Sequence, residues 1–148
     1  MAFTFKIQID APPEAVFDYL SDMKRHPEWA NPKAKMKMEE VSGGAPAKGA
    51  TYHSRALFIG KPVSADLTVT EFDRPRRFTF SVMHHQDGKK DASFEQSFRL
   101  TAAGGGTMVE KVVGGGGNPV VGYLVYPAIR GDAMASLRNL KTRVESAA

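Results

Sequence analysis

Hydrophobic and polar residues alternate in several stretches before the glycine run at residues 114–117. The clearest alternation lies in residues 63–73, where apolar side chains occupy every second position from Val63 to Val69. Successive side chains of a strand point to opposite faces, so this period predicts strands with one buried face. Strands are predicted on this basis, or from related apolar spacing, in residues 3–9, 35–42, 50–59, 63–73, 78–82, 94–100 and 107–113.

Apolar residues recur with a helical period at both ends of this series of strands. Val16, Phe17 and Leu20 form the apolar stripe of a first short helix, and Pro27 begins a second. A long helix is predicted from Pro119 onward, and its apolar face is formed by Ile129, Ala133, Leu137, Leu140 and Val144. The predicted order is therefore a strand, two short helices, a series of strands and one long closing helix.

The predicted sheet and closing helix favour an internal cavity. Strands this close in sequence pair as an antiparallel meander, and the apolar face of such a sheet must be covered. A helix of about 25 residues is ~38 Å long, which is enough to cross a curved sheet. Residues 120–129 are apolar around nearly the whole helix, more than packing on one sheet requires, so we expect unfilled space beneath them. Gly114–Gly117 is a candidate hinge for a gate at the mouth of this space.

Length and composition fit one domain, residues 1–148, of ordinary globular type. A chain of this length buries roughly 68–70% of its unfolded surface, and its 42% apolar and 24% charged residues are unexceptional. The absence of cysteine excludes disulfides, thiolate metal ligands and a cysteine nucleophile. The first residues do not resemble a secretory signal, and no run approaches the ~18 apolar residues of a membrane span. We therefore expect a soluble cytoplasmic protein with no integral membrane segment.

The net charge of the chain is +4 and its isoelectric point is near 9.4. Basic residues such as Lys24, Arg74, Lys89 and Arg138 are scattered over different predicted elements. A nucleic-acid-binding protein gathers such residues on one face or carries a recognised motif, so we expect no nucleic-acid partner. The glycine runs lack the Lys-Ser/Thr of a phosphate-binding loop and the setting of a dinucleotide fold, and no cofactor is predicted.

Four segments, taken together and in this order, resemble the START-like superfamily. They are Ile9-Asp-Ala-Pro-Pro-Glu-Ala-Val-Phe-Asp18, His26-Pro-Glu-Trp29, Val69-Thr-Glu-Phe-Asp-Arg-Pro-Arg-Arg-Phe78 and Leu137-Arg-Asn-Leu-Lys-Thr-Arg-Val-Glu145. This group includes the birch-pollen-allergen fold and the polyketide cyclase/dehydrase (SRPBCC) family. The resemblance implies an α+β helix-grip fold, in which a curved antiparallel sheet of about seven strands surrounds a long C-terminal helix, with two short helices after the first strand. It also implies a cavity for an apolar ligand.

Large side chains that we expect to line this cavity, with ordinary core packing as the alternative, are Trp29, Tyr52, Phe58, Phe80, Phe98, Tyr123, Tyr126 and Met134. His84 joins them, because the parity of Phe80 and Val82 turns it inward and its neighbour His85 outward. The two histidines therefore cannot share one metal ion. Metal binding needs about three converging ligands, and no metal site is predicted.

Other titratable residues are expected to have structural or surface roles. Glu95, Arg99, Glu110 and Lys111 lie in neighbouring strands and fit a charged outer face. Asp66 lies opposite the apolar positions of its strand and is expected to be exposed, and His26 is expected to be structural.

These patterns favour binding of a hydrophobic small molecule or lipid in the cavity. One alternative is an enzyme of the polyketide aromatase/cyclase type, which would use the same cavity and one or two polar residues. Another is a protein-interaction module that uses residues 120–129, where an exposed apolar patch would also favour a homodimer. A cavity that holds His84 within reach of a tyrosine or carboxylate would favour the enzyme.

Overall fold

The computed structural model describes residues 2–115 and 119–147 of the chain. Its elements follow one another in the order β1 (Ala2–Ile9), α1 (Pro13–Leu20), η1 (Met23–Arg25), α2 (His26–Trp29), η2 (Pro32–Ala34), β2 (Lys37–Glu40), β3 (Thr51–Phe58), β4 (Lys61–Asp73), β5 (Arg77–His85), β6 (Ala92–Ala103), β7 (Gly106–Gly115) and α3 (Pro119–Ala147). The two predicted short helices are α1 and α2, and η1 and η2 are single 3₁₀ turns beside α2.

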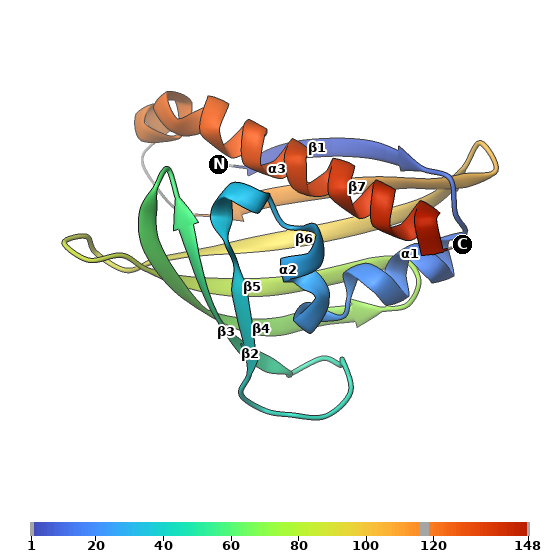
Figure 1. Ribbon diagram of the computed structural model, residues 1–148, viewed down its shortest axis with the longest axis horizontal. Helices are drawn as coiled ribbons and strands as arrows, with labels where there is room; N and C mark the ends of the chain where they lie inside the picture. Colours follow the sequence, from blue (N-terminus) through green and yellow to red (C-terminus); the bar gives the residue numbers. More distant parts are fainter. Residues whose placement is uncertain (1, 116–118, 148) are drawn as a thin grey trace.

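The strands form one antiparallel sheet of seven, in the order β1-β7-β6-β5-β4-β3-β2. Consecutive strands from β2 to β7 pair as a meander, and β1 completes the sheet beside β7. Figure 1 shows the sheet curving, with α3 lying across one face and α1 and α2 next to it. This is the predicted α+β helix-grip arrangement, and the fold class is confirmed.

The core fills the space between the sheet and the second half of α3. Leu137 and Leu140 of α3 are fully buried there, as the apolar stripe predicted. Phe17 of α1 packs edge-on against Phe72 and Phe78, with ring centroids 5.2 and 6.3 Å away. Burial of each such side chain contributes about 1.5–3 kcal/mol, so this half of α3 is firmly held. Ile129, nearer the N-terminus of α3, is only partly buried.

Polar contacts fasten the same end of the molecule. Arg74 donates from Nε and Nη2 to the two carboxylate oxygens of Asp18 at 2.8 and 3.0 Å, which ties the β4–β5 turn to α1. Near the C-terminus of α3, Glu145 accepts a hydrogen bond from the backbone N–H of Asp10 at 2.8 Å. None of the helices in the described part of the chain has the length and hydropathy needed to cross a membrane.

Candidate functional site

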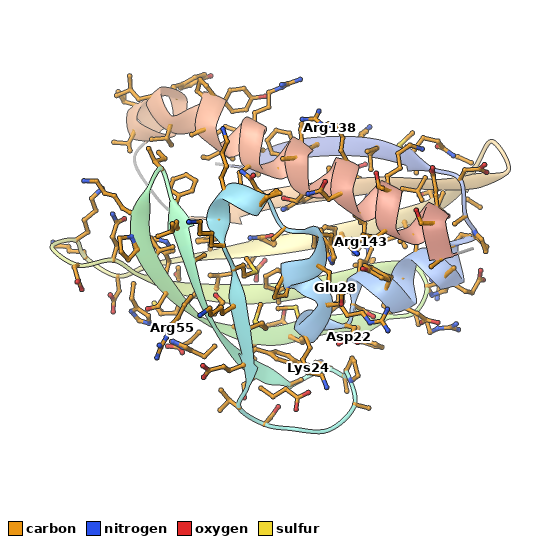
Figure 2. All side chains as sticks on the ribbon, in the orientation of Figure 1. Asp22, Lys24, Glu28, Arg55, Arg138 and Arg143 are labelled. Atoms are coloured by element: carbon orange, nitrogen blue, oxygen red, sulfur yellow. The ribbon has the colours of Figure 1, made fainter. Side chains whose placement is uncertain are left out.

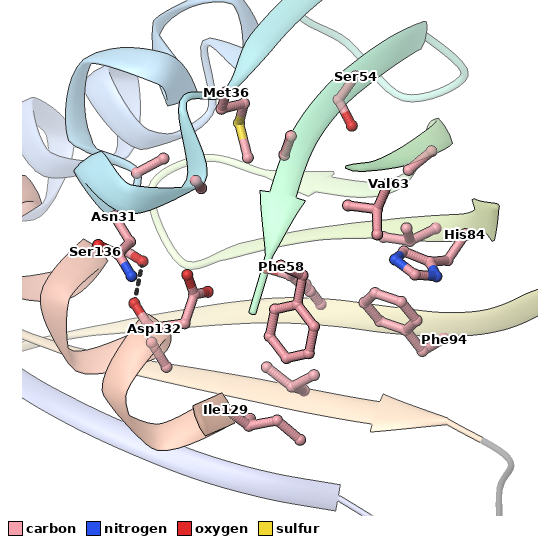
Figure 3. A pocket seen from close by; sticks show the side chains of 18 of the residues that line it. Asn31, Met36, Ser54, Phe58, Val63, His84, Phe94, Ile129, Asp132 and Ser136 are labelled. Carbon is pink, nitrogen blue, oxygen red and sulfur yellow. Dashed lines mark hydrogen bonds between the residues drawn. The ribbon is translucent and has the colours of Figure 1, made fainter. Parts of the chain in front are cut away.

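A cavity of about 460 Å³ lies between the sheet and the first half of α3. Figure 3 shows Phe58, Val63 and His84 on its sheet side and Ile129 on its helix side. Most of its lining is apolar, including the rings of Phe80 and Phe94. Its volume falls within the range of roughly 300–1,000 Å³ that is typical of small-molecule sites. The unfilled space expected beneath the apolar half of the helix is therefore present.

Of the residues predicted to bind a ligand, Trp29, Phe58, Phe80 and His84 line the cavity. His84 faces the cavity, and the adjacent His85 turns to the outer face, where it contacts Asp66. Burial lowers the pKa of His84, with smaller contributions from His85 and Lys89. Among the described residues, the aromatic neighbour of His84 is Phe94, at 6.3 Å between centroids, and no tyrosine or carboxylate bonds to its ring.

Five other predicted lining residues lie elsewhere. Tyr52 and Phe98 are buried in the core beside the cavity. Tyr126 packs against the rings of Phe3 and Phe5, at 5.1 and 6.3 Å, and Met134 is partly buried against the core. Tyr123 is 77% exposed.

Helix geometry explains why the three predicted residues of α3 miss the cavity. Val121, Val125 and Ile129, spaced by four residues, carry the lining face of α3. The aromatic character of Tyr123 and Tyr126 did not reveal that they occupy other faces of the helix.

His26, which was expected to be structural, is both buried and part of the cavity wall. Its Nε2 donates to the backbone oxygen of Leu20 at 2.7 Å, and its ring packs against Trp29 at 4.7 Å. Burial lowers the pKa of His26 to about 4, although the hydrogen bond to Leu20 opposes the shift. The imidazole is therefore neutral at pH 7 and fixes the α1–α2 segment against the sheet.

Lys111 was predicted to belong to a charged outer face, and this prediction is wrong, because its side chain is buried in the cavity wall. Glu110 does face outward, where it pairs with Lys6 at 3.8 Å. Lys111, as the next residue of β7, must point the opposite way, and it is only 6% exposed within the cavity wall. The signal in the sequence was its spacing: Lys111 lies two residues from both Val109 and Val113, on the same face of the strand.

Asp132 and Ser136 bring further polar groups to the helix side of the cavity. Figure 3 shows Asp132 projecting from α3 toward Phe58. The Ser136 hydroxyl donates to the backbone oxygen of Asp132 at 2.6 Å. Neither residue was predicted from the sequence, where the second half of the helix was described by its apolar positions, such as Ala133 and Leu137.

A separate chain of histidines and carboxylates lies on the outer face of the sheet. Asp66, exposed as predicted, accepts from His53 Nδ1 at 2.8 Å and from His85 Nε2 at 3.0 Å. These hydrogen bonds lower the pKa of Asp66, and contacts to Asp91 and Asp66 raise that of His85. Within residues 2–115 and 119–147, no group of three or more metal-ligating side chains is arranged to hold a metal ion.

The glycine run at 114–117 begins inside a strand. Gly114 and Gly115 are the last residues of β7 and border the cavity. A Cβ on Gly115 would lie 2.6 Å from Cβ of Phe94, so this position needs glycine for close packing. Gly116 and Gly117 lie outside the described residues, and their role as a hinge stays a prediction.

Solved structures with the same fold are numerous. Protein MLL2253 from Mesorhizobium loti is 19% identical, with 99% of this chain and 98% of that chain covered and a TM-score of 0.76. Ara h 8.0201 is 16% identical, with coverages of 99% and 98% and a TM-score of 0.73. DynU16, a protein of the dynemicin biosynthetic locus, is 17% identical, and this chain spans 48% of it at a TM-score of 0.68. At these identities the likeness concerns the fold alone.

Sequence comparison establishes the family directly. No curated protein matches the chain. The model of a family described as polyketide cyclase/dehydrase and lipid transport matches residues 1–145. This match covers all four segments that carried the START-like resemblance. The chain therefore belongs to the polyketide cyclase/dehydrase and lipid transport family.

Proposed function

We propose that the protein binds a hydrophobic small molecule or lipid in the cavity between α3 and the sheet. The observation that carries this proposal is a mainly apolar cavity of about 460 Å³ with a few ionisable groups in its wall. A ligand would gain about 25 cal/mol per Å² of apolar surface that it buries, before the entropic costs of binding. The family description, which includes lipid transport, supports the same function.

The entrance that we propose lies between α3, η2 and the β3–β4 hairpin. A groove of about 400 Å³ runs there, and Phe58 and Asp132 belong to the walls of both the groove and the cavity. Ile59 at the hairpin tip lines this groove and is an exposed apolar residue, at 66%. Movement of α3 away from the β3–β4 hairpin would open this path to a ligand.

A cyclase-type reaction in the same cavity is the second candidate. The observation that favours it is the presence of His84, Lys111 and Asp132 in the wall, since each can exchange a proton with a molecule held nearby. A carrier returns its ligand unchanged, whereas an enzyme does not. Mass spectrometry of a polyketide-like ligand before and after incubation separates the two functions.

Binding is tested by titration with the neutral fluorophore N-phenylnaphthylamine. Ala56 faces the cavity from β3, so Ala56→Trp fills part of it. The adjacent Arg55 projects away from the molecule in Figure 2, so Arg55→Trp adds the same ring on the outside. We expect the wild type and Arg55→Trp to bind alike and Ala56→Trp to bind at least about tenfold more weakly, a loss of about 1.4 kcal/mol. Lack of binding by the wild type, or equal binding by Ala56→Trp, would contradict the proposal.

A further inference from the structure

Lys111 places a cationic group in the wall of an apolar cavity. It lies on β7 between the inward-facing Val109 and Val113, and it is 6% exposed. Taking an ammonium ion out of water costs several kcal/mol unless a counter-charge and hydrogen bonds replace the lost hydration. A lysine at this position therefore needs a partner.

The described residues do not supply that partner. No hydrogen bond and no carboxylate within 4 Å is found for Lys111 Nζ in residues 2–115 and 119–147. The ammonium lies 5.6 Å from the centroid of the Phe98 ring, a cation–π contact that offsets part of the cost. Burial lowers the pKa of Lys111. The negative charge of Asp132, which forms no ion pair with the ammonium, opposes this shift in part.

A second donor without a hydrogen-bond partner lies beside the Phe98 ring. Trp29 Nε1 is buried and has no hydrogen-bond partner among the described residues, and its ring lies 6.1 Å from that of Phe98. An indole N–H and an ammonium can only donate. The nearby Nε2 of His26 already donates to Leu20. The cavity wall thus carries one cationic donor, Lys111, to which no acceptor bonds among residues 2–115 and 119–147.

We propose that the cavity takes an apolar molecule that carries one carboxylate, with the carboxylate bound by Lys111 Nζ. The inference rests on the proposed binding function and specifies its ligand class. A neutral hydroxyl would accept a hydrogen bond but leave the charge uncompensated, and an amine would be repelled. The negative charge of Asp132 on the opposite wall disfavours a doubly charged head group, so one carboxylate matches the site.

The test compares dodecanoate, dodecanol and dodecylamine, which share a chain and differ in head group, in competition with N-phenylnaphthylamine. The wild type is expected to bind dodecanoate roughly tenfold to a hundredfold more tightly than dodecanol, as for a charge-assisted hydrogen bond. Dodecylamine should bind most weakly. Lys111→Met should abolish the preference and leave dodecanol binding within about threefold of the wild type. Lys6→Met, which removes a 61% exposed lysine from the adjacent strand β1, should keep the preference.

Each contrary outcome has a distinct meaning. Equal binding of dodecanoate and dodecanol by the wild type would overturn the carboxylate inference and leave the proposed function intact. A preference for dodecanoate that survives in Lys111→Met would overturn the assignment to Lys111. Failure of the wild type to bind the fluorophore and all three compounds would overturn both proposals. The comparison on the wild type is decisive even if Lys111→Met does not fold.

Discussion

His26 links the acid stability of the fold to a single buried ring. The unfolded chain takes up a proton on this histidine near pH 6.5, whereas the folded protein does so only near its pKa of about 4. Between these values the unfolded state binds more protons, so the free energy of unfolding falls as the pH falls through this window. We predict a loss of about 3 kcal/mol between pH 7 and pH 4 from this group.

Urea unfolding at several pH values measures this effect. His26→Gln retains an N–H that can donate to the Leu20 oxygen but cannot titrate, so the difference between the two proteins isolates the histidine. The free energy of unfolding of the variant should change less over the window by about that amount. Parallel pH profiles for the two proteins would contradict this account, because they would mean that His26 has the same pKa in the folded and unfolded states.

The inward orientation of a site residue was predictable where it lies in a strand with apolar neighbours two residues away. Val82 and His84 lie two residues apart in one strand, so the inward orientation of His84 could be predicted from an apolar neighbour. The same reasoning on Val109 and Val113 gives Lys111, but the expectation that lysines are exposed outweighed it. The orientation of side chains on α3 could not be predicted in this way, because residues 120–129 are apolar on nearly every face. Tyr123, which was expected to line the cavity, is exposed.

At the level of elements, two glycines show opposite packing requirements. A Cβ on Gly131, inside α3, would meet no atom within 4 Å, so Gly131→Ala should raise the free energy of unfolding by about 0.5–1 kcal/mol through helix propensity. A Cβ on Gly106 would lie 2.3 Å from the backbone oxygen of Ile9. Gly106→Ala should therefore force β7 away from β1 and lower the free energy of unfolding by about 1–3 kcal/mol.

Glycine to alanine should thus change the free energy of unfolding in opposite directions at the two sites, which urea unfolding followed by circular dichroism can measure. Effects of one sign would mean that the packing described for β1 and β7, or for α3, is wrong.

The elements themselves were largely predictable from periodicity. Alternation identified the long strands, and the spacing from Ala133 to Val144 identified the buried face of α3. Both patterns are readable because these elements have one solvent-exposed face and one buried face. The start of the 114–117 run was less predictable. Its composition indicated a hinge, whereas Gly114 and Gly115 extend β7 by pairing with β6, and the close approach of Phe94 leaves no room for a Cβ at Gly115.

For the whole molecule, ligand binding should appear as added stability. A ligand at about 100 times its Kd stabilises the native state by ~2.7 kcal/mol. For a chain of this size that corresponds to a rise of about 5–10 °C in Tm. We predict such a rise with dodecanol, measured by scanning calorimetry, and a smaller rise for Ala56→Trp at the same concentration. A shift that is equal in both proteins would place binding outside the cavity.

The most direct measurement uses the single tryptophan of the chain as a reporter of the cavity. Trp29 lines the cavity, and its indole N–H gives one signal in a proton–nitrogen correlation spectrum. On titration with dodecanol this signal should move and then saturate, together with backbone signals of wall residues such as Phe80 and Val125. A spectrum in which these signals stay fixed while dodecanol is in excess would contradict binding in the cavity.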